Sequence, residues 1–477
     1  MTNTTPGAPV SAAPRQQGWR ALFSLRHLGA TVTISLGVAL YAFNEFFVST
    51  ALPSAVDELG GAALISWAFT FFVVFAIVGG LSAAQVKARL GARAALALSA
   101  LIFLAGSVMT VMAGNMAVMI AGRALQGLGE GIVAAICYAL IPVLFPRDLV
   151  QKVFGLEAVV WAVAAFTGPV LAGALTEYFS WRIAFAFNIA VGVVFLLLVL
   201  VSLPRGARDE TAGPLPLKRL ALAGGGILLV SVAATAGHAA AAAMFAAAVL
   251  ALLAAWRLDS GHRHPILPAG AFGWRSLVGA GLWVILLMPL SQAAGSVFMV
   301  FGFQFLWGFG ATVAGALAAT LAVAWSLTAI AVASLAGETR RLQAVAAGPV
   351  LLAAGMAAAC AGVALGSLST VIAGQVAMGV AFGLNWGPLC ELLMERAPAA
   401  DRDRTSALLP TLQTVGYGLG AAAFGLVANL AGFGDTADLA GARSGIVTAY
   451  AGAALVAAAA AVFGLRTARL ARPGHPK

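Results

Sequence analysis

Long apolar stretches recur along the whole chain and are separated by short polar segments. A helix of about 20 apolar residues spans the roughly 30 Å hydrocarbon core of a bilayer, so each stretch predicts a membrane span. We place spans at 28–52, 65–86, 94–113, 117–141, 153–175, 183–203, 219–237, 239–256, 276–301, 312–335, 343–364, 369–392, 406–431 and 445–465. The pair within 219–256 is the weakest, because only Gly-His-Ala separates two short alanine-rich runs.

Two polar breaks, 204–219 and 257–275, divide the spans into six, two and six. We therefore expect an all-α integral membrane protein of two six-helix bundles plus two linker helices, fourteen transmembrane helices in all. The predicted domains are a tail at 1–27, a first bundle at 28–203, a linker with two helices at 204–275, a second bundle at 276–467 and a tail at 468–477. Two six-helix halves are typical of transporters that rock around a central site.

Composition agrees with a membrane protein. Of the 477 residues, 61% are hydrophobic and only 9% are charged, whereas soluble domains carry about 25% charged residues. Too little polar sequence remains to coat the surface of a soluble protein. We expect a lipid bilayer as its surroundings and a monomer as its working form.

The net charge of +10 has a clear pattern. Apart from Arg123, Arg182 and Arg443, the 27 basic residues fall in the tails and in alternate loops on one side. Cytoplasmic loops carry an excess of lysine and arginine, so both termini are predicted to be cytoplasmic. The charge is spread over many loops rather than gathered on one face, which argues against a nucleic-acid partner.

Ionisable residues inside the spans are the main candidates for function. Arg123, Gln126, Gly127 and Glu130 follow helical spacing and share one face of a span. A charged side chain costs roughly 2.5–3.5 kcal/mol at mid-membrane, so this face must meet protein or a water-filled cavity. Intramembrane carboxylates often belong to proton relays. A buried ion pair without a transport role is the alternative interpretation.

The first span has a similar polar face, with Tyr41, Asn44 and Glu45 at helical spacing. Counting residues from the ends of the spans places Glu45 and Arg123 both roughly 10 Å below the outer surface. If the two spans share a cavity, we expect Glu45 to pair with Arg123 or to compete with it for a proton. Whether Glu45 or Glu130 titrates stays open.

Five short motifs occur in order along the chain: STALP (49–53), RALQGLGEG (123–131), GPVLAG (168–173), FSWRIAFAFN (179–188) and HPILPAGAF (264–272). With these motifs the chain resembles the major facilitator superfamily, and most of all its fourteen-span drug:proton antiporter branch. The resemblance implies that Arg123 takes part in proton coupling. It also implies an antiporter motif at Gly168, Pro169 and Gly173, and a gating loop at Lys87, Arg89, Gly91 and Arg93.

Three positions depart from the family pattern. Asn44 stands where the branch has an aspartate, and the acid is the next residue, Glu45. Ala88 replaces the usual aspartate of the gating loop, and Glu130 replaces a usually small residue. We therefore expect Glu45, Arg123 and Glu130 together to exchange protons for substrate.

A second set of residues is predicted to line a substrate cavity: Tyr41, Asn44, Gln126, Met288, Gln292, Asn385, Trp386, Gln413 and Tyr417. Aromatic and methionine side chains suit amphipathic substrates, and the carboxylates favour cationic ones. We expect an efflux transporter of lipophilic or cationic small molecules in the inner membrane of a bacterium. Export of one endogenous metabolite or siderophore, uptake of a nutrient with protons, and a sensor without flux are alternatives.

An enzyme is not expected. No Ser–His–Asp arrangement or metal-ligand cluster is visible in the sequence, and the three cysteines lack metal-ligand spacing. We expect no cofactor and no metal. Glu157 and Glu391 lie near the predicted cytoplasmic ends of their helices and are interpreted as interface residues.

Overall fold

The computed structural model describes residues 18–60, 64–209, 212–233, 238–335, 337–433 and 439–472, and these residues form helices and connecting loops without a strand. The predicted tail segments 1–17 and 473–477 lie outside the described residues. The first bundle holds α1 (Leu28–Leu59), α2 (Ile65–Leu90), α3 (Ala92–Val111), α4 (Met116–Leu144), α5 (Arg147–Tyr178) and α6 (Trp181–Ser202). The second holds α9 (Leu277–Phe305), α10 (Ala311–Val332), α11 (Glu338–Leu365), α12 (Leu368–Arg396), α13 (Arg402–Ala428) and α14 (Leu439–Leu470). Short helical turns are η1 (Trp19–Phe23), η3 (Ala399–Asp401) and η4 (Asn429–Phe433).

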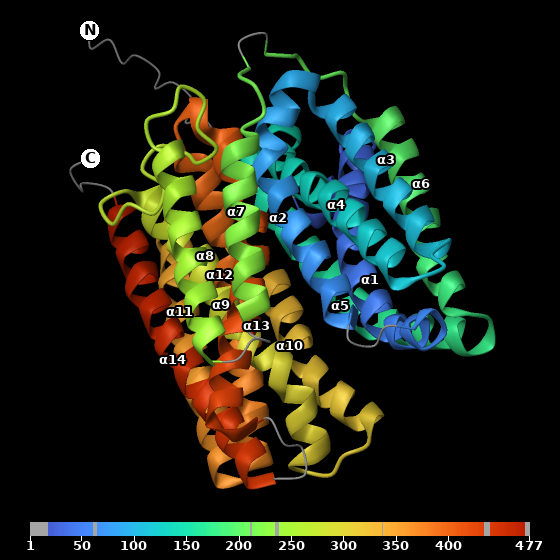
Figure 1. Cartoon of the computed structure of the whole chain (residues 1–477). Coiled ribbons are helices and arrows are strands. Elements are labelled where there is room, and N and C mark those ends of the chain that lie inside the picture. Colours follow the sequence, from blue (N-terminus) through green and yellow to red (C-terminus); the bar gives the residue numbers. More distant parts are fainter. Residues whose placement is uncertain are drawn as a thin grey trace, which may run out of the picture.

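The two bundles stand side by side, with the start of α1 and the end of α14 at the same end of the molecule (Figure 1). We call this end the terminal face and the opposite end the distal face. Helices α1, α5, α9 and α13 run away from the terminal face, whereas α4, α6, α10 and α12 run toward it. In Figure 1 the ribbons of the two bundles diverge toward the distal face.

Twelve of the described helices, α1–α6 and α9–α14, are long and apolar enough to cross a membrane. This is a multi-pass membrane protein. Several helices are longer than their predicted spans: α1 continues to Leu59 and α5 begins at Arg147. The sequence pattern marks only the apolar part of a helix, so it does not predict the polar ends that project beyond that part.

The linker between the bundles forms two further helices, α7 (Leu217–Ala233) and α8 (His238–Asp259), which lie side by side in Figure 1. Helix α7 packs against both α2 and α13 and so touches both bundles. At 1.5 Å per residue its 17 residues measure about 26 Å, and the 22 residues of α8 about 33 Å. The two linker helices are present as expected, although neither is among the twelve above.

Glycines of the QGLGEG stretch bring α4 into close contact with α2. A Cβ added at Gly127 would lie 2.1 Å from the carbonyl oxygen of Phe72, and one at Gly131 would lie 1.9 Å from that of Ala76. Because these glycines are four residues apart, they form one smooth strip along α4. Small residues are the usual means by which membrane helices approach closely.

Candidate functional site

The polar face of α4 is buried at the centre of the first bundle. The Arg123 guanidinium donates to Asn44 Oδ1 on α1 (3.1 Å) and to Gln126 Oε1 (2.9 Å). Asn44 Nδ2 in turn donates to Glu130 Oε2 (3.0 Å), and Gln126 Nε2 donates to Ser107 on α3 (2.9 Å). The network therefore ties α1, α3 and α4 together through neutral amides placed between the two charged groups.

The charges in this network are not directly paired. Arg123 is 1% exposed and Glu130 is fully buried. Arg123 also lies 4.0 Å from the Phe72 ring centroid, where the π-system attracts its cation. Within the described residues Arg123 has no carboxylate within ion-pair distance, and Glu130 Oε1 has no hydrogen-bond partner. A buried carboxylate oxygen without a partner is costly when ionised, which makes Glu130 a candidate proton acceptor.

The expected contact between Glu45 and Arg123 is made by Asn44 instead. Successive residues of a helix are rotated by about 100°, so the inward direction of Asn44 turns Glu45 away from α4. The Glu45 side chain is exposed, while Asn44 is buried. Glu45 remains within electrostatic range of Arg123 but does not bond to it.

Asn188 of α6 is a member of the network that the sequence reasoning did not assign. Its Nδ2 donates to Asn44 Oδ1 (3.3 Å), and its own Oδ1 has no partner. Asn188 ends the motif FSWRIAFAFN, and it is a polar residue within an apolar span. That position is the signal that could have identified it.

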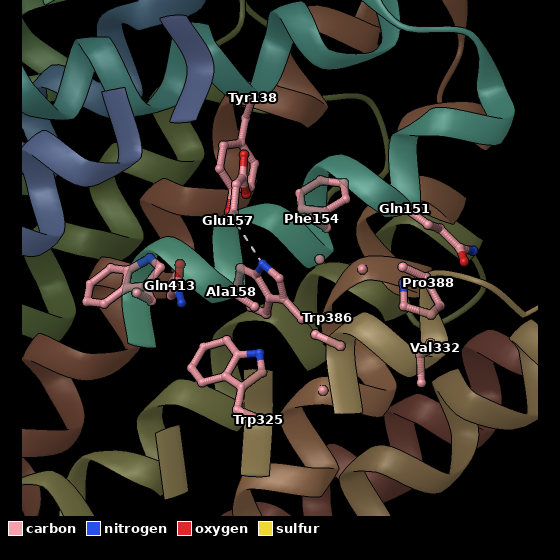
Figure 2. Close-up of a pocket in the computed structure, with 16 residues that line it drawn as sticks. Tyr138, Gln151, Phe154, Glu157, Ala158, Trp325, Val332, Trp386, Pro388 and Gln413 are labelled. Atoms are coloured by element: carbon pink, nitrogen blue, oxygen red, sulfur yellow. Dashed lines mark hydrogen bonds between the residues drawn. The ribbon is translucent and has the colours of Figure 1, made fainter. Parts of the chain in front are cut away.

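A pocket lies between the two bundles (Figure 2). Its walls come from α4, α5, α10, α12 and α13. Trp386 and Gln413, both predicted cavity residues, line it. Trp386 Nε1 donates to the Tyr138 hydroxyl across the bundles (3.4 Å). Glu157 of α5 is a further wall residue, as Figure 2 shows.

The other predicted cavity residues are distributed differently. Met288 is buried in the core of the second bundle, and Asn385 is buried with its Nδ2 on the Val345 carbonyl of α11 (2.8 Å). Gln292 is buried as well, against Gly295 of its own helix. The Asn385 contact matches the packing role that polar side chains have between membrane helices.

Tyr41 and Tyr417 lie closer to the space between the bundles. Both side chains are half-buried, and both are within electrostatic range of Glu45. The Tyr41 ring stands 5.7 Å from that of Trp161, a wall residue of the pocket. The aromatic groups therefore continue from the pocket toward Glu45.

The antiporter motif packs α5 against α1. A Cβ at Gly168 would lie 2.8 Å from Phe46 Cβ, so this glycine allows the close approach of α1. Pro169 lies inside α5, where it removes one helix hydrogen bond. Gly173 has looser surroundings, 3.9 Å from Thr50.

The residues of the predicted gating loop lie where α2 meets α3 at the terminal face, but most of them are helical: Lys87 and Arg89 belong to the last turn of α2, Arg93 belongs to α3, and only Gly91 lies between the two helices. Lys87 forms an ion pair with Asp403 at the start of α13 (2.7 Å), whereas Arg89 is exposed and Arg93 is half-buried. Gly91 has a φ of +78°, a conformation that favours glycine. Lys87 thus bridges the two bundles even though Ala88 stands at the usual aspartate position.

Further polar contacts across the two bundles gather near the same face. Arg147 pairs with Glu395 (2.7 Å), and Gln151 donates to the Glu391 carboxylate. Ser326 of α10 donates to the Ala158 carbonyl of α5 (2.7 Å). The interpretation of Glu391 as an interface residue agrees with these contacts. The molecule is therefore closed at its terminal face.

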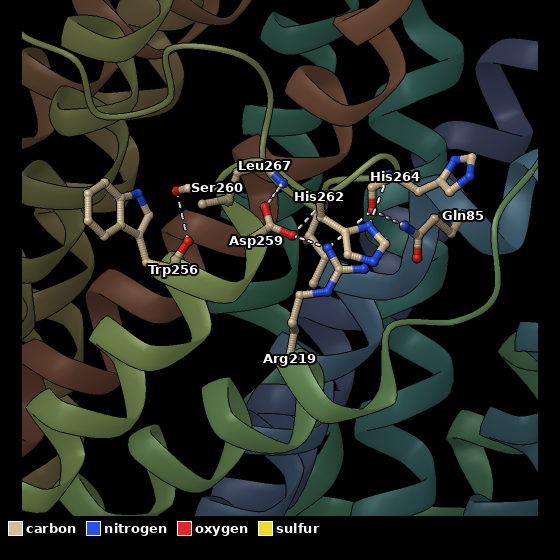
Figure 3. Close-up of polar contacts among 9 residues, drawn as sticks. Gln85, Arg219, Trp256, Asp259, Ser260, His262, His264 and Leu267 are labelled. Atoms are coloured by element: carbon tan, nitrogen blue, oxygen red, sulfur yellow. Dashed lines mark hydrogen bonds and ion pairs between the residues drawn. The ribbon is translucent and has the colours of Figure 1, made fainter.

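The linker adds a clamp on the terminal face (Figure 3). Arg219 of α7 and Asp259 of α8 form a buried ion pair, and Arg219 also donates to the His264 carbonyl (3.1 Å). Asp259 accepts the backbone N–H groups of Ile266 (2.7 Å) and Leu267 (2.9 Å). The HPILPAGAF segment is thereby fixed to both linker helices.

That segment also reaches both bundles. Gln85 of α2 donates to the His264 carbonyl (3.4 Å), as Figure 3 shows, and the Ala269 N–H donates to Asp401 of η3 (2.9 Å). The HPILPAGAF motif thus has a structural role that the sequence did not predict, because it connects the linker to the closed face.

Comparison with known proteins identifies the family. A probable multidrug-efflux transporter of Mycobacterium tuberculosis is 31% identical over 469 residues, covering 92% of this chain and 98% of that protein. The chain belongs to the major facilitator superfamily. The family model of that superfamily matches residues 34–232. An uncharacterised transporter of Escherichia coli is 24% identical, with 92% and 95% of the two chains covered.

Solved structures of the superfamily share the fold. The human organic anion transporter MFSD10 superposes with a TM-score of 0.69 at 14% identity, covering 92% of this chain and 99% of that one. The proton:xylose symporter XylE, bound to a halogenated glucose, superposes with a TM-score of 0.63 at 16% identity, covering 91% and 94%. The protein is a transporter of this superfamily and not an enzyme.

Proposed function

We propose that this protein is a proton-coupled exporter, a drug:proton antiporter, of amphipathic small molecules that are lipophilic or cationic. The observation that carries the proposal is the buried network of Asn44, Arg123 and Glu130, in which a carboxylate oxygen has no partner. The multidrug-efflux relative and the antiporter motif at 168–173 support export rather than uptake.

The network suits a proton that is taken up and released. Glu130 is separated from Arg123 by the Asn44 amide, so the cation does not neutralise the carboxylate directly. A proton on Glu130 removes the cost of burying its charge, and the loss of that proton restores the cost. A rearrangement of α1 against α4 changes this balance and couples the proton to the motion.

Glu45 has the complementary position in this proposal. Its side chain is exposed between the bundles and lies near Tyr41 and Tyr417. It is the first carboxylate that a proton or a cationic substrate in that space would meet. One charge moved through 100 mV supplies about 2.3 kcal/mol, which sustains a gradient of roughly 50-fold.

The proposal also assigns the orientation in a bacterial cytoplasmic membrane. The terminal face carries most of the basic residues, so it is the cytoplasmic side by the positive-inside rule. The closed terminal face then makes this conformation outward-facing. Alternating access requires that the Lys87–Asp403 and Arg147–Glu395 pairs open in the inward-facing conformation.

The test is uptake of the cationic dye ethidium by inside-out vesicles with an imposed proton gradient, acidic inside. The wild-type protein is expected to accumulate dye and to lose accumulation when a protonophore is added. Glu130→Gln keeps an oxygen that accepts the Asn44 hydrogen bond but cannot be ionised, so we expect at least a tenfold loss of gradient-driven transport. Glu45→Gln is measured in parallel, and Glu177→Gln, an exposed distal position, is the matched control.

Three outcomes would contradict parts of the proposal. Dye accumulation that ignores the protonophore would exclude proton coupling. Full activity in Glu130→Gln would move the coupling role to Glu45. Correctly inserted wild-type protein that moves no dye would exclude the drug substrate and favour a single metabolite or nutrient.

A further inference from the structure

Glu157 is a buried carboxylate that the mechanism above does not use. It lies ten residues into α5 from the terminal face and is only 4% exposed. Its Oε1 has no hydrogen-bond partner, and no basic side chain of the described chain lies within ion-pair distance of it. The sequence alone favoured a simple interface role for it.

Glu157 lies between the two bundles, whereas Glu130 lies at the centre of the first bundle. Tyr138 lies beside it from α4, while Trp325 and Trp386 face it from the second bundle (Figure 2). The neighbouring residue, Ala158, accepts a hydrogen bond from Ser326 of α10. Closing the terminal face therefore buries Glu157, and opening that face would expose it.

The ionisable groups around Glu157 do not supply a counter-charge. Tyr138 and Cys137 of α4 and Cys390 of α12 lie within electrostatic range of Glu157. Helix α10 carries no ionisable residue, and α13 contributes the neutral Gln413 to the same pocket.

The other basic side chains near α5 are bonded to other groups or lie away from Glu157. On α5 itself, Lys152 donates to the Asp148 carbonyl (2.9 Å), and Arg341 of α11 is paired with Glu391. The carboxylate of Glu45 is on the distal side of α1, Arg20 of η1 is exposed, and Arg182 of α6 lies at the distal face, where it pairs with Glu58.

We propose that Glu157 is a second exchange carboxylate, which must be neutralised by a proton or by a cationic substrate before the terminal face can close. This inference rests on the proposed antiport. An ionised carboxylate is costly in the closed pocket, because it has neither a cation nor a full set of hydrogen bonds there. In the open form water hydrates it, and its proton passes to the cytoplasm.

The proton balance of the cycle follows directly. With the terminal face open, Glu157 releases its proton to the cytoplasm and binds a cation in its place. Closure carries the neutral pair to the outward-facing form, where a proton from the distal side displaces the cation and the cation leaves on that side. The protonated carboxyl then returns to the inward-facing form, in which the next proton is released. Glu157 thus controls closure, whereas Glu130 belongs to the packing of α1 against α4.

The experiment measures opening of the terminal face directly. Spin labels are placed at two exposed positions, Ala94 on α3 and Arg402 on α13, in a background without native cysteines. Distances are recorded in detergent from low to high pH without substrate. We expect the wild-type open population to rise with pH, and Glu157→Gln, which is always neutral, to stay closed with an open population at least tenfold smaller at high pH.

Controls separate this role from a structural one. Glu177→Gln removes an exposed carboxylate from the distal end of the same helix and is expected to leave the pH profile unchanged. Glu157→Asp keeps an ionisable group on a shorter side chain and is expected to restore pH-dependent opening with a displaced midpoint. If Glu157→Gln does not fold, the pH midpoint of opening in Glu157→Asp is compared with that of the wild type instead, and a displaced midpoint supports the inference.

The outcomes are unambiguous. The inference is overturned if the open population depends on pH in the same way in the wild type and in Glu157→Gln. If Glu157→Gln does not fold, the same comparison is made between the wild type and Glu157→Asp. A closed Glu157→Gln together with pH-dependent opening in Glu157→Asp supports it. The spin-label distances are measured without a proton gradient or a dye, so they test the role of Glu157 independently of transport. A failure of the vesicle experiment alone would overturn the proposed antiport.

Discussion

Gly131 of α4 gives the sharpest quantitative prediction. Replacing it by alanine adds a Cβ that would lie 1.9 Å from the carbonyl oxygen of Ala76 on α2. Ordinary contact begins near 3.4 Å, so the two helices would have to separate by about 1.5 Å. The obstacle is backbone rather than a flexible side chain, and a change of rotamer cannot relieve it.

We expect Gly131→Ala to lower the free energy of unfolding by about 3 kcal/mol, the upper part of the range for overpacked cores. Because the entropy of unfolding grows with chain length, that corresponds for 477 residues to a fall in Tm of about 3 °C. Glu130 is the preceding residue, so separation of α4 from α2 also moves its carboxylate relative to Asn44. Gradient-driven dye transport should therefore fall as well.

The assay is thermal unfolding in detergent, followed with a thiol-reactive dye. The thiols of Cys137 and Cys390 are buried in the folded protein and react when it unfolds. Gly315→Ala is the matched control, because a Cβ at Gly315 of α10 meets nothing within 4 Å. That control should keep or slightly raise Tm, since alanine favours a helix over glycine. Equal Tm values for the two variants would refute the packing argument.

Two further predictions concern the terminal face. Asp259→Ala removes the acceptor of Arg219 and of two backbone N–H groups, and it leaves the arginine buried without its carboxylate. We expect the free energy of unfolding to fall by about 3–5 kcal/mol in the same assay, and a fall below about 1 kcal/mol would show that this ion pair does not stabilise the fold. Lys87→Met breaks a partly exposed ion pair with Asp403, which is worth at most about 1 kcal/mol of stability. We therefore expect Tm to change little, but the spin-label distances to show a larger open population. An unaltered distance distribution would contradict a gating role for this pair.

Much of this molecule follows from the sequence alone. The length of the apolar stretches sets the number and order of the helices, because only a helix satisfies its own backbone hydrogen bonds in lipid. The spacing of Arg123, Gln126 and Glu130 sets their common face, since 3.6 residues complete each turn. The cost of burying charge shows that this face does not meet lipid.

The tertiary structure decided which groups meet across helices. The rotation of α1 brings Asn44 rather than Glu45 to Arg123, and Asn188 reaches the same amide from α6. A span pattern gives depth to about a turn but not the rotation of one helix about its axis, which depends on packing with its neighbours.

The closed terminal face also belongs to the tertiary structure. Glu157 lies without a counter-charge because α10 and α12 form the wall of its pocket without contributing a basic residue to it. Its own span gives no sign of this, because the environment of a buried carboxylate is built from residues far away in the chain. The sequence therefore determined which helices form and where charge is buried, and the packing of the two bundles determined which carboxylates are left without a partner.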